Sequence, residues 1–257
     1  MFFLLFVACA KPEPAPADLD GLVHLFFAKY DTATDEELRA AAVNLLPLLQ
    51  EPSRGLVDDL TAEEQATVRV DPPRDPADAT GMFVAGPIAC TLADLEVVNY
   101  ALDQEGLYEA VTGDEEYIAY DRVYESDLTA YEARTDPFLT WRTTYTVQPV
   151  VSEYTAEIDG GMRFVPALDG VGPVVMSRST LPSPATFAGE TDDFFDQDYQ
   201  IDVMLGDGDT SVHVYAAWRD LSSLGLEDES AGVQDLLLNG FEDFDRDTEL
   251  VCAAGEF

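Results

Sequence analysis

The feature that most constrains the fold of this chain is a series of extended segments followed by one long amphipathic helix. Residues 117–221 contain six stretches rich in β-branched and aromatic residues, separated by turn-forming residues. In the clearest stretch, Leu139 and Trp141 alternate with polar residues, which is the period-two pattern of a half-buried strand. The segments DGG at 159–161 and GDGD at 206–209 contain the glycines that tight hairpin turns require. These residues predict a large antiparallel sheet.

The long helix is predicted at residues 230–253, SAGVQDLLLNGFEDFDRDTELVCA. One face of this helix carries a continuous stripe at helical spacing, made of Val233, Leu237, Phe241, Phe244, Thr248 and Val251. Before the sheet, residues 81–90 predict a first strand, and residues 91–110 predict a helix with Thr91 as its N-cap. The expected order is therefore strand, helix, six strands and a long helix.

A helical segment is expected in front of this α+β domain. We assign the helical segment to residues 19–77 and the α+β domain to residues 78–257. Thr34 and Glu37 have the spacing of a capping box, which marks the start of one helix in the first of these segments. The sequence DPPRDPADATG at 71–81 is rich in turn-forming residues and marks the boundary between the two.

The composition combines enough apolar residues for a packed core with an extreme acidic charge. Hydrophobic residues make up 47% of the 257 positions, and 51 acidic residues against 13 basic ones give a net charge of −38. This charge repels nucleic-acid phosphates and anionic head groups, so we expect no nucleic-acid partner. The acidic surface either attracts a basic protein or reflects adaptation to salty surroundings, and the scattered positions of the acids favour adaptation.

The N-terminus contains an apolar stretch that ends in a cysteine, FVAC at Phe6–Cys9. It resembles the bacterial lipobox, in which the cysteine receives a lipid and becomes the first residue after signal-peptide cleavage. The resemblance implies that residues 1–8 are a signal-peptide remnant, that Cys9 is lipidated and that Pro-rich residues 9–18 are a tether. Ala10, which follows the cysteine, implies sorting to the outer membrane of the cell envelope. A secretory signal without an anchor is the alternative.

Two further cysteines, Cys90 and Cys252, remain if Cys9 carries a lipid. An exported protein lies in an oxidising compartment, so this even pair predicts a disulfide. The alternative is two buried free thiols, because cysteine often behaves as a small apolar residue.

The predicted order of elements resembles the helix-grip fold of START-like proteins, over residues 78–254. In that family a curved antiparallel sheet wraps a C-terminal helix and keeps an apolar cavity between them. The resemblance implies that the first strand and the final helix lie close together, which suits a bridge between Cys90 and Cys252. A generic α+β sandwich is the competing fold.

No catalytic motif stands out in the sequence. Its two histidines, His24 and His213, lie among apolar residues, and no nucleophile elbow, zinc motif or phosphate-binding loop is present. The acidic run DFDRDTE at 243–249 has threonine where an EF-hand loop needs glycine, so we expect no metal site there. We expect no cofactor and no enzymatic activity.

Four aromatic residues are candidates for the walls of a ligand cavity: Trp141, Tyr145, Phe164 and Trp218. Aromatic residues at strand spacing also fill ordinary cores, which is the alternative. The sequence thus predicts a membrane-anchored lipoprotein that acts as a binding or interaction module, with an apolar small molecule or a basic protein as its partner. A structural surface protein without a ligand, or a hydrolase that uses dispersed carboxylates, are the other possibilities.

Overall fold

The computed structural model describes residues 14–113, 117–148, 153–167, 172–189, 195–220, 231–255 and 257. The helices are α1 (Leu19–Ala28), α2 (Asp35–Leu45), α3 (Ala62–Gln65), α4 (Leu92–Tyr100), α5 (Gln104–Thr112), α6 (Leu128–Glu132) and α7 (Ala231–Ala254). The strands are β1 (Ser53–Val57), β2 (Thr80–Ile88), β3 (Ala119–Tyr124), β4 (Phe138–Val147), β5 (Tyr154–Val165), β6 (Val174–Thr180), β7 (Thr186–Phe187), β8 (Asp198–Asp207) and β9 (Thr210–Arg219). Single 3-10 turns cover Leu46–Leu48 and Pro76–Asp78.

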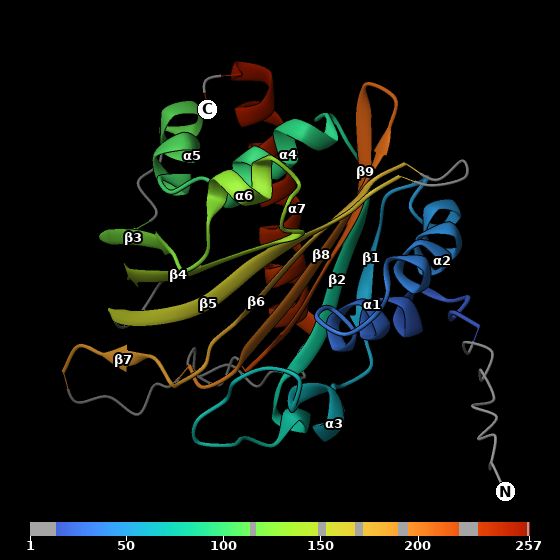
Figure 1. Cartoon of the computed structure of the whole chain (residues 1–257). Coiled ribbons are helices and arrows are strands. Elements are labelled where there is room, and N and C mark those ends of the chain that lie inside the picture. Colours follow the sequence, from blue (N-terminus) through green and yellow to red (C-terminus); the bar gives the residue numbers. More distant parts are fainter. Residues whose placement is uncertain are drawn as a thin grey trace, which may run out of the picture.

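The strands form one sheet in the order β1-β2-β9-β8-β6-β5-β4-β3, and β7 pairs with the end of β5. Every pairing between neighbours is antiparallel. The sheet curves strongly, with α1 and α2 in front of it and α7 behind it in the view of Figure 1. This arrangement confirms the predicted fold class, an α+β fold in which a curved antiparallel sheet packs on a long C-terminal helix.

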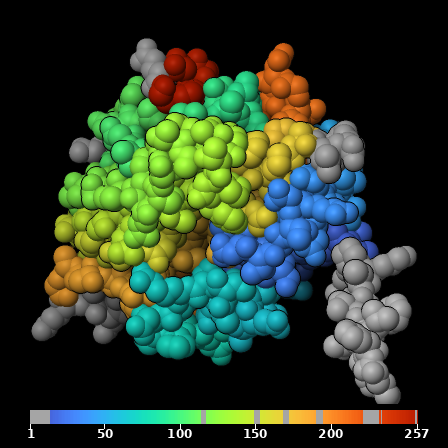
Figure 2. Space-filling model, in the orientation of Figure 1, coloured from blue at the N-terminus to red at the C-terminus, as the bar shows by residue number. Residues whose placement is uncertain are grey.

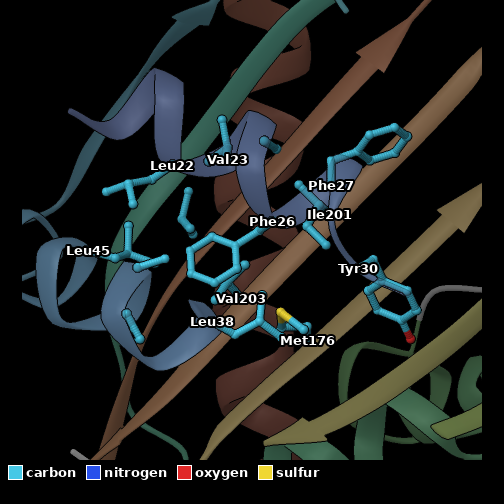
Figure 3. Close-up of a cluster of buried hydrophobic side chains, with 14 of the residues drawn as sticks. Leu22, Val23, Phe26, Phe27, Tyr30, Leu38, Leu45, Met176, Ile201 and Val203 are labelled. Carbon is cyan, nitrogen blue, oxygen red and sulfur yellow. The ribbon is translucent and has the colours of Figure 1, made fainter. Parts of the chain in front are cut away.

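Helices α1 and α2 cover one face of the sheet. Phe26 and Leu38 are fully buried against Met176, Ile201 and Val203 of the central strands (Figure 3). The capping box predicted at the start of α2 is present, because the Thr34 hydroxyl accepts from the Glu37 backbone. In the space-filling view, α1 and α2 form part of the outer surface and α7 is visible only at one end (Figure 2).

Helix α7 covers the opposite face of the sheet. Its Leu238 and Phe241 pack on Met82, Val84 and Ala217. Beside it, α4 and α6 cover the end of the same face, where a second apolar cluster fills the space: Ile88, Cys90, Leu95, Tyr131, Leu139, Trp141, Met162, Val175 and Met204. The alternation of side chains along each strand divides the apolar residues between the two faces, so each face needs its own cover.

Polar and covalent contacts attach α7 to the rest of the domain from its middle to its C-terminal end. The contacts join Glu242 to Arg54, Asp245 to His213, Thr248 to Tyr108, Glu249 to the backbone N–H of Ala89, and Cys252 to Cys90. The predicted disulfide is confirmed, with the two Cα atoms 5.6 Å apart. In the first half of α7, Arg54 also donates to the Asn239 side chain at 2.7 Å and lies 4.0 Å from Asp235, so both halves of the helix are attached to the sheet.

Four local features differ from the prediction. The segment DGG at 159–161 forms no turn, since it lies inside the continuous strand β5. The helix expected at 91–110 is interrupted after Tyr100, and Asp103 caps a new helix by accepting from the Gly106 backbone. The segment expected to be helical also contains β1, which pairs with β2, and the short helix α6 was not predicted.

The disulfide closes a loop of 162 residues, so its loss should destabilise the fold strongly. The double variant Cys90→Ala, Cys252→Ala should lose roughly 3–5 kcal/mol of unfolding free energy, because its unfolded chain regains the entropy that the bridge removes. Urea unfolding measures this loss. Reduction of the wild type should reproduce the loss, and reductant should leave the double variant unchanged. A wild type that keeps its stability in reductant would contradict the expectation.

Candidate functional site

A cavity of about 540 Å³ lies between the sheet and α7. Its floor comes from β4, β5, β6, β8 and β9, and its cover comes from the first half of α7. Aromatic and aliphatic side chains make up most of its walls: Tyr117, Tyr120, Trp141, Tyr145, Val147, Tyr154, Ile158, Phe195, Tyr215, Leu236, Leu237, Phe241 and Phe244. Small-molecule sites have volumes of roughly 300–1,000 Å³ and mostly apolar walls, so the cavity suits a ligand of that class.

Along α7, the residues at the mouth of the cavity are four positions apart. Leu236 and Phe244 line the cavity and are still 57% and 48% exposed. Gly240 lies between them on the same face, lines the cavity, and has no heavy atom within 4 Å of the place where a Cβ would stand. The cavity therefore opens to solvent along this edge of α7.

Two of the four aromatic candidates, Trp141 and Tyr145, line the cavity. Trp141 has room there because β5 carries glycine beneath it. A Cβ on Gly160 would come within 2.3 Å of the indole Nε1 of Trp141. The glycines that suggested a turn in the sequence therefore permit close packing of an aromatic ring on a strand.

The other two candidates, Phe164 and Trp218, lie outside the cavity. Trp218 belongs to the opposite face of the sheet, where its ring contacts Phe27 of α1 and its Nε1 donates to the Asp58 carbonyl. Its position follows from the alternation along β9, which places every second residue on the α1 side. The side chain of Phe164 lies on the same face of β5 as the cavity. It is outside the cavity, however, under the guanidinium of Arg134.

The part of the cavity floor formed by β6, β8 and β9 carries a network of paired polar side chains. Arg219 donates through Nε and Nη2 to the two carboxylate oxygens of Asp198, at 3.1 Å each. Asp198 also accepts from the amide of Gln200, and Ser179 donates to Gln200. This network neutralises the Arg219 charge inside the cavity, so Arg219 offers little attraction to a charged ligand.

Tyr145 and Tyr215 are two of the tyrosines that line the cavity. Burial raises the pKa of Tyr145 and of Tyr215 above the ordinary value, since the phenolate form would lose its hydration. Both hydroxyls therefore stay protonated at neutral pH. Each can donate a hydrogen bond to a ligand, and neither has the low pKa of a catalytic nucleophile or base.

His213 connects the sheet to α7 beside the cavity. Its Nδ1 lies 3.3 Å from Asp202 on β8, and its Nε2 lies 3.2 Å from Asp245 on α7. These two carboxylates outweigh the effect of burial, which alone lowers the pKa, and raise the pKa of His213 to about 10. The imidazole is thus a cation at neutral pH, and both ring nitrogens are engaged, so neither is left to activate a nucleophile.

Arg122 lies at the opposite wall of the cavity from Arg219, on β3. Its guanidinium lies over the ring of Trp141, with a distance of 4.9 Å from Cζ to the ring centroid. Burial lowers the pKa of Arg122 from its usual value. The guanidinium is charged at neutral pH all the same, because the ordinary pKa of arginine lies far above neutral pH.

Sequence reasoning missed Arg122, although its signal was present. In the segment YDRVY, Tyr120, Arg122 and Tyr124 alternate with exposed residues, so one face of β3 carries two aromatic rings and a cation. The sequence did not say that this face points into the cavity. That depends on the pairing of β3 with β4, which sets Arg122 beside Thr143.

The acidic run in α7 makes no metal site. Asp243 pairs with Arg246, Asp245 pairs with His213, and Glu249 accepts from the Ala89 backbone. Within the described ranges, no group of three or more candidate ligands converges on one point. Nor is any described helix both long and apolar enough to cross a bilayer.

No protein-family model matches the chain, and no curated protein matches it either. Several solved structures are similar to it. A STAR-related lipid transfer protein from Xanthomonas axonopodis is 8% identical, with a TM-score of 0.42, and the match covers 76% of this chain and 93% of that one. Human STARD10 is 8% identical, with a TM-score of 0.45, and the match covers 87% and 81%.

The lipid transfer and protein localization domain of human StarD13 is 9% identical, with a TM-score of 0.40, and the match covers 86% of this chain and 98% of that one. All three scores are below 0.5. The assignment of the fold therefore rests on the strand order and on the position of α7.

The raised pKa of His213 predicts how stability changes with pH. The pKa of a histidine in the unfolded chain is near 6.5, whereas the pKa of His213 in the folded protein is about 10. Between pH 6.5 and about pH 10, the folded state therefore binds one more proton than the unfolded state. The stabilisation is complete below pH 6.5 and is lost as the pH rises through about 10. The unfolding free energy should therefore fall between pH 7 and 9, by up to about 1.4 kcal/mol per pH unit.

Urea unfolding of the wild type and of His213→Gln at pH 7, 8 and 9 tests this expectation. The variant should show a flatter dependence on pH, because its residue 213 cannot bind a proton. Equal slopes for the two proteins would show that His213 does not hold its proton in the folded state.

Proposed function

We propose that this protein is a non-catalytic binding module that holds an apolar small molecule between the sheet and α7. One observation carries the proposal. The face of the sheet under α7 is only partly filled by side chains, and aromatic rings surround the space of about 540 Å³ that is left. Burial of an apolar ligand in this space would gain about 0.8 kcal/mol for each methylene removed from water.

The polar groups beside the cavity support binding in preference to catalysis. His213 lies between two carboxylates, and Arg219 is paired with Asp198. Buried tyrosine hydroxyls such as those of Tyr145 and Tyr215 are suited to orienting a ligand by hydrogen bonds. A structural surface protein without a ligand is the second possibility, and it predicts that blocking the cavity changes no binding.

Gly240→Phe should block the cavity without unfolding the protein. The new side chain meets no heavy atom at its Cβ, and replacing a glycine within a helix favours the helix. Binding of the neutral, environment-sensitive dye Nile red should weaken at least tenfold, as measured by fluorescence titration. The melting temperature should not fall.

Gly232→Phe is the matched control. Gly232 also lies in α7 with open space at its Cβ, and it is not part of the cavity wall. This variant adds the same apolar ring to the same helix, so it should bind Nile red like the wild type. If both variants bind the dye like the wild type, the dye does not use the cavity and the proposal fails.

We further propose that the protein is a lipoprotein of the cell envelope, anchored in the outer membrane through Cys9. Three features support this assignment. The sequence FVAC resembles a lipobox, a Pro-rich segment follows it, and the Cys90–Cys252 bridge uses the other two of the three cysteines. Cys9 and the apolar stretch before it lie outside the described residues.

Mass spectrometry of the protein from its native membrane fraction tests the anchor. The N-terminal peptide should begin at Cys9 and carry the added mass of a diacylglycerol and an acyl chain. Cys9→Ser should move the protein from the membrane fraction to the soluble fraction, whereas the double variant Cys90→Ala, Cys252→Ala should stay with the membrane. An unmodified Cys9 in the mature protein would contradict the assignment.

A further inference from the structure

Arg122 differs from every other arginine of the chain in its charge partner. Ten of the eleven arginines form an ion pair with a carboxylate: Arg39, Arg54, Arg69, Arg74, Arg134, Arg142, Arg163, Arg178, Arg219 and Arg246. Among the described residues, no carboxylate lies within ion-pair distance of Arg122. With 51 acidic residues against 13 basic ones, a half-buried cation that has no carboxylate partner in the described part of the chain is unexpected.

Neutral oxygens hold the Arg122 guanidinium in place. Nε donates to the Thr143 hydroxyl at 3.0 Å, and Nη1 donates to the carbonyls of Asn99 and Ala101 at 2.7 and 3.0 Å. Nη2 donates to the Gln104 side-chain oxygen at 2.8 Å. A guanidinium has five N–H donors, so these contacts leave one donor on Nη2.

The surroundings of the guanidinium offset its charge only in part. The carbonyls of Asn99 and Ala101 lie at the C-terminal end of α4, where the helix dipole is negative. The rings of Trp141 and Tyr120 add cation–π contact, at 4.9 and 5.7 Å from Cζ to the ring centroids. None of these groups carries a full negative charge.

The other guanidinium in the cavity shows the contrast. Arg219 meets both oxygens of Asp198, so that pair is neutral. A bound molecule with a negative charge would therefore be drawn to the Arg122 side of the cavity and not to the Arg219 side. The cavity therefore has a positively charged end at Arg122 and a neutral end at the Arg219–Asp198 pair.

We infer that the cavity binds an amphipathic molecule with a single carboxylate, which accepts a hydrogen bond from Arg122 while the apolar body lies along Trp141, Tyr145 and Phe241. This inference rests on the proposed function of the cavity. A carboxylate brings one negative charge to one unpaired cation. A phosphate monoester would bring about −1.5 to −2 and leave the excess uncompensated.

A matched pair of ligands tests the inference, namely dodecanoate and dodecanol, which share one chain and differ in the charged end. Each is used to displace Nile red from the full-length protein at pH 7.5. Dodecanoate should bind the wild type at least tenfold more tightly than dodecanol does. In Arg122→Met the affinity for dodecanoate should fall to that of dodecanol, and the affinity for dodecanol should stay unchanged.

Arg246→Met is the charge-matched control. Arg246 lies on the exposed surface of α7 and pairs with Asp243, so its loss changes the net charge by the same unit without touching the cavity. This variant should keep the preference for dodecanoate. If it loses the preference as Arg122→Met does, the effect comes from the overall charge and the inference is overturned.

A second measurement avoids dependence on the folding of Arg122→Met, since this residue also holds the end of α4. The carboxyl carbon of ¹³C-labelled dodecanoate bound to the wild type should titrate at a lower pH than in the free acid, because a guanidinium favours the ionised form. A bound carboxyl that titrates at or above the pH of the free acid overturns the inference.

The outcomes separate this inference from the proposed function. If dodecanoate and dodecanol bind equally and Gly240→Phe blocks both, the cavity is a binding site and the carboxylate assignment is wrong. If Gly240→Phe blocks Nile red and neither ligand displaces the dye, the carboxylate assignment is wrong as well. If the dye binds regardless of Gly240→Phe, the proposed function itself fails and the inference fails with it.

Discussion

The attachment of α7 to one face of the sheet is the interaction on which the rest of the structure depends. A curved antiparallel sheet with apolar residues on both faces is stable only when both faces are covered, because exposed apolar surface favours aggregation or unfolding. Helices α1 and α2 cover their side with one cluster of buried apolar side chains. Helix α7 covers the other side and is attached through His213, Glu249 and the Cys90–Cys252 bridge.

The cavity lies under the first half of α7. The C-terminal half of α7 packs beside α4, whereas its first turns extend over polar and aromatic residues of the central strands. Gly160 lets Trp141 lie flat against β5, and Trp141 in turn supports the guanidinium of Arg122. The interruption between α4 and α5 presents the Asn99 and Ala101 carbonyls that hold the same guanidinium. A glycine in a strand and an interruption between two helices would each weaken regular secondary structure, and here both contribute to the wall of the cavity.

Much of the fold could be predicted from local patterns. Several strands show alternation, most clearly β4, α7 shows a helical stripe, and α2 shows its capping box. Each of these patterns depends on residues that are close together in the sequence. The strand β1 carries no such signal, since SRGLV has no alternation of its own and becomes extended by pairing with β2. The segment DGG was misjudged because glycine serves both for turns and for close packing, and only the position of Trp141 distinguishes the two uses.

The sequence by itself predicted the fold class, a bridge between Cys90 and Cys252 as one of two possibilities, and the presence of Trp141 and Tyr145 on one face of a strand. These predictions depend on the spacing of apolar residues and on the number of cysteines, both of which can be read from the sequence. Only the tertiary structure decided that Trp218 faces α1 and not the cavity, and that Arg122 pairs with no carboxylate of the described residues. The physical reason is that burial and charge pairing depend on which segments distant in sequence become neighbours, and strand register and the position of α7 set those neighbours.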